Sequence, residues 1–109
     1  MLKHLTILLA FLMTLSAPVV AQDFQKGWEA FESGDFARAF KEWKPLAEKG
    51  DDDSQFNLGV LYDHGEGVLK DHAEAVKWYR LAAEQGNPNA QNNLGSKYDS
   101  GIGGVLKDH

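Results

Sequence analysis

Histidines are the residues of this 109-residue chain best suited to metal or acid–base chemistry, and four are present. His4 lies in an apolar N-terminal segment, while His72 and His109 end two similar stretches that are 37 residues apart. A zinc site needs three or four ligands within about 2 Å of the metal, and its sequence signatures place ligands in close pairs. No such pairing surrounds His64, His72 or His109. We therefore expect exposed loop histidines, with no metal site and no cofactor.

Acidic and hydroxyl residues also give no catalytic pattern. Three aspartates at residues 51–53 could suggest calcium, but an EF-hand loop needs alternating acidic positions, a central glycine and a distal glutamate. Carboxylates also suit the positive end of a helix dipole, and we predict that this run begins a helix. No serine lies in a nucleophile elbow, and no Lys-Ser or Lys-Thr of a phosphate loop follows the glycine turn at residues 65–67. The sequence predicts a protein that is not an enzyme.

Residues 55–72 and 91–109 repeat each other, which is the strongest architectural signal in the chain. They read QFNLGVLYDHGEGVLKDH and QNNLGSKYDSGIGGVLKDH, and with one gap 13 of 18 aligned positions are identical. The offset is 36 residues and rises to 37 after the extra glycine. A period of about 20–50 residues is typical of stacked repeat arrays. We expect units that bury their apolar faces against one another.

Glycines separate five segments of helical periodicity, and we find no strand pattern. The expected helices cover residues 23–33, 35–49, 53–64, 71–85 and 88–100. Asp35 and Asp71 are the expected N-caps of the second and fourth helices, and Pro88 suits a first turn. Pro45 lies inside the second helix and removes one backbone donor, so we expect a bend there.

Small and aromatic residues share one face of the second and the fourth expected helix, and these faces should form the interior. They are Ala39, Trp43, Leu46 and Ala47 in the second helix, and Ala75, Tyr79, Ala82 and Ala83 in the fourth. Trp78 is about 100° around the helix from Tyr79, so one ring should pack inward and the other should lie at a seam.

A glycine follows a leucine in the third and in the fifth expected helix. These pairs are Leu58-Gly59 and Leu94-Gly95, with Tyr62 and Tyr98 one turn further on. A glycine inside a helix costs stability, so close approach of another helix is its expected reason. In the loops that follow, Val68 and Val105 are expected to act as apolar plugs.

The first 21 residues are typical of a secretory signal peptide. Lys3 and His4 give a basic start, an apolar run follows, and small residues lead up to Ala21, after which we predict cleavage. An uncleaved anchor is the alternative, but a membrane span needs about 20 apolar residues and this run is shorter. We expect a periplasmic or secreted protein with no stable membrane span after cleavage. Cleavage would remove Lys3 and change the net charge from −5 to −6, which argues against nucleic-acid binding. The chain has no cysteine, so its stability is expected to come from packing alone.

A longer pattern resembles the Sel1-like repeat, a relative of the tetratricopeptide repeat. It reads Leu58-Gly59-x-x-Tyr62-x-x-Gly65-x-Gly67-Val68-x-x-Asp71-x-x-x-Ala75-x-x-Trp78-Tyr79-x-x-Ala82-Ala83-x-x-Gly86. The match is close over residues 51–86 and cut short over 87–109, while residues 22–50 look like a degenerate, more tetratricopeptide-like unit. The resemblance implies an all-α fold, an α/α right-handed superhelical solenoid of antiparallel helix pairs. It also implies an adaptor or regulator that binds a protein or peptide.

The related tetratricopeptide fold implies a binding groove on the concave side, which the first helix of each pair lines. The residues before the two Leu-Gly pairs, Asn57 and Asn93, are expected to project into it, where an amide can hold a peptide backbone. The remaining expected groove residues are Asp53, Phe56, Val60 and Asp63 in one repeat and Asn89, Asn92, Ser96 and Asp99 in the next. The alternative is that both asparagines only bond neighbouring loops or helices.

Two further interpretations stay open. The chain could be an envelope enzyme or hydrolase-like factor, or a truncated remnant without a function of its own. The last repeat stops where its second helix should begin, which leaves Leu94, Tyr98, Val105 and Leu106 partly uncovered. We interpret this as a fragment of a longer array, with an open docking end as the alternative.

Overall fold

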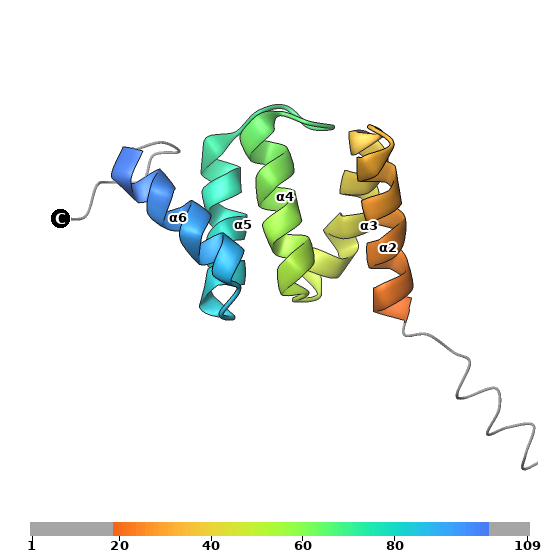
Figure 1. Ribbon diagram of the computed structural model, residues 1–109, viewed down its shortest axis with the longest axis horizontal. Coiled ribbons are helices and arrows are strands. Elements are labelled where there is room, and N and C mark those ends of the chain that lie inside the picture. Colours follow the sequence, from red (N-terminus) through yellow and green to blue (C-terminus); the bar gives the residue numbers. More distant parts are fainter. Residues whose placement is uncertain (1–18, 101–109) are drawn as a thin grey trace, which may run out of the picture.

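Five α-helices follow one another in the computed structural model, which describes residues 19–100 (Figure 1). They are α2 (Val19–Glu32), α3 (Phe36–Glu48), α4 (Asp52–His64), α5 (His72–Glu84) and α6 (Pro88–Ser100). No strand occurs in this part of the chain, and none of these helices is both long and apolar enough to cross a membrane. The all-α prediction is confirmed. Residues 1–18, which include His4, and the later residues Val105, Leu106 and His109 lie outside the described residues.

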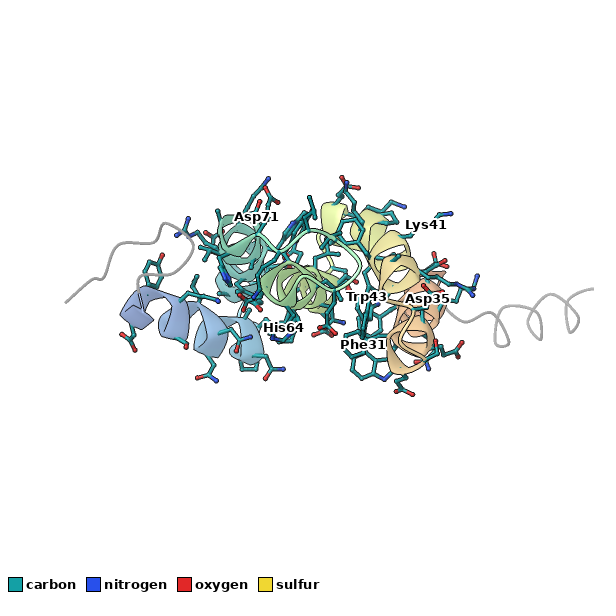
Figure 2. All side chains as sticks on the ribbon, turned by 90° about the horizontal axis from the view of Figure 1, so that it is seen from above. Phe31, Asp35, Lys41, Trp43, His64 and Asp71 are labelled. Carbon is teal, nitrogen blue, oxygen red and sulfur yellow. The ribbon has the colours of Figure 1, made fainter. Side chains whose placement is uncertain are left out.

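The helices form two layers. Helices α2, α4 and α6 lie on one side, in front in Figure 1, and α3 and α5 lie behind them; Figure 2 shows the same layers from above. Each helix packs on its neighbours in sequence, so that α3 joins α2 to α4 and α5 joins α4 to α6. Successive antiparallel pairs therefore lie side by side, as in a helical solenoid.

Aspartate side chains begin three of the helices. Asp35 accepts a hydrogen bond from the backbone N–H of Arg38 at 3.2 Å, and Asp71 accepts one from Glu74 at 3.0 Å, which confirms both predicted N-caps. Asp51 accepts one from the N–H of Ser54 at 3.0 Å and caps α4. The run at residues 51–53 thus begins a helix, as predicted. Its carboxylates lie at the first turn, where backbone N–H groups have no partner within the helix.

One helix boundary differs from the prediction by several residues. Helix α2 begins at Val19, not at residue 23, so it runs through the predicted cleavage site at Ala21. Helix α3 continues past Pro45 up to Glu48, as predicted, because proline removes one donor without ending the hydrogen bonds on either side.

The interior is built from the residues that the periodicity placed there. Ala39, Trp43, Leu46 and Ala47 of α3 are at most 3% exposed, and Tyr79 of α5 is 1% exposed. Trp78 is also buried and belongs to the same core cluster as Trp43 and Leu58. The indole N–H of Trp43 donates to the carbonyl of Phe24 at 3.1 Å, which ties α3 to the start of α2.

Two glycines act as sockets for these aromatic rings. A Cβ at Gly27 would collide with the indole of Trp43, and a Cβ at Gly59 would collide with the ring of Tyr79. The predicted reason for Gly59, close approach of another helix, is therefore confirmed. Gly27 marks the same position in α2, but it lies 32 residues before Gly59 and not 36.

The loop between α4 and α5 joins one unit to the preceding one. Gly65 ends α4 in the left-handed region, with φ of 68°, and Val68 packs against the core as predicted. A Cβ on Gly67 would meet the backbone of Phe36, so this loop reaches back to the start of α3. Tyr62 also turns to that unit, with its ring 5.6 Å from the ring of Phe40.

Candidate functional site

A hollow of about 380 Å³ opens between α2 and α4, on the layer that also contains α6. We call it the α2–α4 groove. The residues that line it are Phe24, Gln25, Trp28, Asp53, Phe56, Asn57 and Asn89. Three helices thus contribute to one surface, because the solenoid brings their equivalent faces together.

Aromatic side chains form the walls of the groove, and rings of the core hold them in place. Trp28 is 39% exposed and stacks on Phe31 with ring centroids 5.4 Å apart. The ring of Phe24 lies 5.9 Å from that of Trp43, and the ring of Phe56 lies 5.7 Å from that of Tyr79. Side chains fixed in this way lose little conformational entropy when a partner binds, so the walls are preorganised.

Three amides provide the polar part of the groove. Gln25, Asn57 and Asn89 each offer a donor and an acceptor. Within residues 19–100, no hydrogen bond engages any of these three side chains. Asn57 is half-buried and lies beside Phe56 in the sequence of α4. Such an arrangement can bond the backbone of an extended chain and hold one of its apolar side chains at the same time.

The rim of the groove near α6 is acidic. Asp53 accepts a hydrogen bond from the side-chain amide of Asn87 at 3.1 Å, and Asp52 accepts one at 3.0 Å. Burial, followed by the charges of Asp52 and Asp51, raises the pKa of Asp53 above its ordinary value. A positive group from a partner would relieve this crowding of negative charge.

The structure places the ten expected groove residues in four different settings. Asp53, Phe56, Asn57 and Asn89 line the α2–α4 groove. Asn92, Ser96 and Asp99 are exposed on α6 outside it, and Val60 and Asn93 are half-buried. Asp63 is engaged in contacts between the helices.

The expected set lacked the contribution of α2, which consists of Phe24, Gln25 and Trp28. The glycine sockets supply the signal that would have found these residues. Phe24 and Gln25 stand three and two residues before Gly27, as Phe56 and Asn57 stand before Gly59. The 36-residue offset hides this relation, because the first unit is four residues shorter than the next.

Asp63 links α4 to α5 and α6. Its Oδ1 atom lies 2.7 Å from Nδ1 of His72 and also accepts from Nζ of Lys97, while Oδ2 accepts from the hydroxyl of Tyr79 at 3.3 Å. The side chains of Asp63 and Lys97 are only 14% and 12% exposed. Burial would raise the pKa of Asp63, but the hydrogen bonds and charges of Lys97 and His72 outweigh it and hold this pKa below its ordinary value.

The carboxylate of Asp63 should make the free energy of unfolding depend on pH. Its pKa is lower in the folded state, so its contribution is complete above the ordinary value of about 3.8 and is lost as pH falls through the folded value. We expect Asp63→Asn to lower the free energy of unfolding by about 1–2 kcal/mol at neutral pH. That difference should shrink below about pH 4. Urea unfolding across this range measures it, with Asp99→Asn on the exposed side of α6 as control. A difference independent of pH would contradict the assignment.

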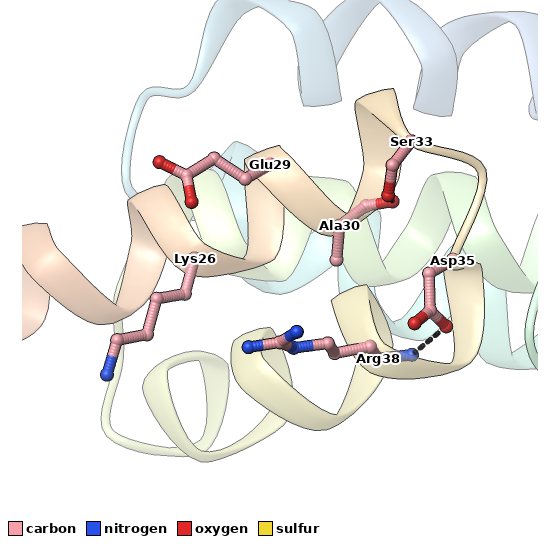
Figure 3. A pocket seen from close by; sticks show the side chains of 6 residues that line it. All are labelled: Lys26, Glu29, Ala30, Ser33, Asp35 and Arg38. Carbon is pink, nitrogen blue, oxygen red and sulfur yellow. Dashed lines mark hydrogen bonds between the residues drawn. The ribbon is translucent and has the colours of Figure 1, made fainter.

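A second hollow, of about 200 Å³, lies between α2 and the start of α3 (Figure 3). It is lined by Lys26, Glu29, Ala30, Ser33, Asp35 and Arg38. The Ser33 hydroxyl donates to the carbonyl of Ala30 at 2.9 Å, and Asp35 caps α3, so these groups are engaged in holding the turn. Across residues 19–100, no three His, Asp or Glu side chains are arranged to hold a metal ion.

Sequence comparison agrees with the architecture. The sequence model of the Sel1 repeat matches residues 52–87 and 88–109, which is just over half of the chain. The chain belongs to the Sel1 repeat family. Sel1 repeats generally mediate protein–protein interactions, and their fold is typically a scaffold without catalytic activity. No curated protein matches the chain.

Two solved structures resemble this Sel1 repeat chain. A protective antigen of uropathogenic Escherichia coli strains, described as displaying an SLR fold, is 39% identical with a TM-score of 0.76 over 82% of this chain. A Sel1 repeat protein from Oxalobacter formigenes is 32% identical with a TM-score of 0.77 over 89%. The chain spans only 20% and 43% of the length of these two proteins. The likeness confirms the solenoid of helix pairs.

Proposed function

We propose that this Sel1 repeat chain is a non-enzymatic adaptor that binds an extended segment of a partner protein in the α2–α4 groove. The observation that carries the proposal is the combination of aromatic walls and unengaged amides in one hollow. Extended peptides bind by backbone hydrogen bonds, which give affinity, and by pockets for alternate side chains, which give specificity. Asn57 is placed for the first task, and Phe24, Trp28 and Phe56 are placed for the second.

The partner segment is proposed to carry an apolar or aromatic side chain near a basic one. The apolar side chain would lie between the rings, and the basic one would lie at the rim beside Asp53. The raised pKa of Asp53 supports this, since a nearby positive charge favours an ionised carboxylate. Electrostatic complementarity of this kind speeds association and helps to exclude wrong partners.

We further propose that the protein acts in the bacterial envelope, after export and cleavage behind Ala21. The basic start and apolar run of the first 21 residues support this. Cleavage there would remove the first three residues of α2 and leave Phe24 and Trp28 in place. N-terminal sequencing of the protein from an envelope fraction tests it, and a chain that still carries Met1 would contradict it.

Replacing Asn57 should weaken partner binding without unfolding the chain. We expect peptides selected on the wild-type protein from a displayed library to bind Asn57→Ala about tenfold or more weakly, since one or two hydrogen bonds to a peptide backbone are lost. Fluorescence anisotropy with a labelled selected peptide measures the affinity, and a thermal melt of each variant measures stability separately.

Asn92→Ala is the matched control, because it removes the same amide from an exposed position of α6 outside the groove. This variant should bind like the wild type. If Asn57→Ala melts much earlier but binds equally well, Asn57 serves the fold and the groove proposal loses its main support.

A further inference from the structure

Asn87 is a buried polar side chain that joins two helices of the first layer. It lies between α5 and α6 and is 5% exposed. Its side-chain amide donates to Oδ2 of Asp52 at 3.0 Å and to Oδ1 of Asp53 at 3.1 Å. Its side-chain oxygen accepts from the backbone N–H of Ala90 at 3.0 Å, so the same group also caps α6. One amide thus fixes the start of α6 against the start of α4.

The equivalent position in the preceding repeat carries an acid. Asp51 lies 36 residues before Asn87 and caps α4 by accepting from the N–H of Ser54 at 3.0 Å. Aspartate, asparagine and serine cap helices about equally well, so the cap does not explain why residue 87 is an amide. An amide differs from a carboxylate in having a donor, and here the donor bonds two carboxylates of the neighbouring helix.

The donated bonds oppose the repulsion within the acidic run. Burial, followed by the charges of Asp52 and Asp51, raises the pKa of Asp53, and the hydrogen bond from Asn87 acts in the opposite direction. Asp53 is exposed and lines the α2–α4 groove, so its carboxylate is both held from behind and open to a partner. A side chain that is already held loses little conformational entropy when it forms an ion pair.

We propose that Asn87 is the positioning residue that gives the α2–α4 groove its preference for a basic partner side chain. Asn87 does not line the groove and acts through Asp53. It also sets the start of α6, where Asn89 contributes to the same groove two residues later. The inference rests on the proposed function, because it names the residue that controls how the rim of that groove selects charge.

Two substitutions separate the cap from the donor, and the first measurement needs no partner. Asn87→Ser keeps a capping oxygen but offers one donor on a shorter side chain, and Asn87→Asp keeps the cap but adds a carboxylate beside Asp52 and Asp53. Carbon NMR of the side-chain carboxyl groups in the full chain gives the pKa of Asp53. We expect this pKa to rise in Asn87→Ser and to rise further in Asn87→Asp, while circular dichroism shows unchanged helix content in Asn87→Ser.

The second measurement is the charge preference of the groove. A peptide selected on the wild-type chain would be made with lysine and with glutamine beside its apolar residue, and fluorescence anisotropy would give both affinities. We expect the wild type to favour the lysine peptide about threefold, which is the order that an exposed ion pair gives. Asn87→Ser should bring this ratio close to one. Asn92→Ser, the same change at an exposed position of α6 outside the groove, should leave the ratio as in the wild type.

The outcomes distinguish this inference from the proposed function. If Asn57→Ala binds both peptides like the wild type, the groove itself is wrongly assigned. If Asn57→Ala weakens both peptides but Asn87→Ser keeps the wild-type ratio, the groove stands and the role of Asn87 is overturned. A wild-type ratio near one, or a pKa of Asp53 that neither substitution at residue 87 changes, would also overturn it.

Discussion

The variant Gly59→Val should lose about 3 kcal/mol or more of unfolding free energy, and the same change at Gly95 should lose almost none. At Gly59 even the first added carbon would collide with the ring of Tyr79, which is 1% exposed and fully buried in the interior. Overpacking a filled interior usually costs about 1–3 kcal/mol, and more where a large ring is forced out of its position. The ring also bonds Asp63 through its hydroxyl, so its displacement would disturb the link to α6.

Gly95 provides an unusually close comparison, because the two glycines occupy equivalent positions in helices of the same layer. At Gly95 an added Cβ would meet no described atom within 4 Å, and glycine and valine are both weak helix formers. We expect a change within about 0.5 kcal/mol there. Urea unfolding followed by circular dichroism measures both variants. Equal losses would mean that helix propensity, not the ring in the socket, decides the cost.

The repeat pattern could be predicted from sequence because each of its signals is local. Asp35 and Asp71 mark helix starts through a hydrogen bond that spans three residues, and both are N-caps in the structure. The close approach of another helix at Gly59 could be predicted because a glycine inside a helix is otherwise unfavourable. The buried face of α3 follows from the spacing of its alanines and Trp43, since a helix brings residues three and four apart onto one side.

The groove was harder to predict, because its walls come from two units with different spacing. The sequence placed Asp53, Phe56 and Asn57 on the inner layer, but it gave α2 no part in the surface. Trp28 was not found since residues 22–50 match the repeat only loosely, and only the socket at Gly27 shows how α2 aligns with α4. Asp63 was predicted to face the groove, yet its carboxylate is held by Lys97 and His72. Lys97 lies 34 positions and His72 lies nine positions after Asp63 in the sequence. These contacts therefore depend on how the units pack against each other.

The core and the groove are coupled through Trp43, and its removal should therefore affect binding as well as stability. Trp43 is 1% exposed and does not line the groove. Its indole fills the socket at Gly27, donates to the carbonyl of Phe24 and packs 6.1 Å from the ring of Trp28. Helix α2 packs mainly on α3, so these contacts are its principal attachment to the solenoid.

Trp43→Ala should cost about 3–5 kcal/mol, as expected for a large aromatic residue removed from a filled core. In a repeat array each unit contacts only its neighbours, so the loss should fall mainly on α2 and α3. Hydrogen exchange should then show unprotected amides in α2 while α4 and α5 keep most of their protection. Peptides selected on the wild-type groove should lose affinity, because Phe24 and Trp28 would no longer be held opposite Phe56.

Uniform loss of protection along the chain would show that the units unfold together and that α2 has no separate attachment. Unchanged binding by Trp43→Ala would show that the ligand does not need α2, and the groove would then have to be assigned to α4 and α6 alone.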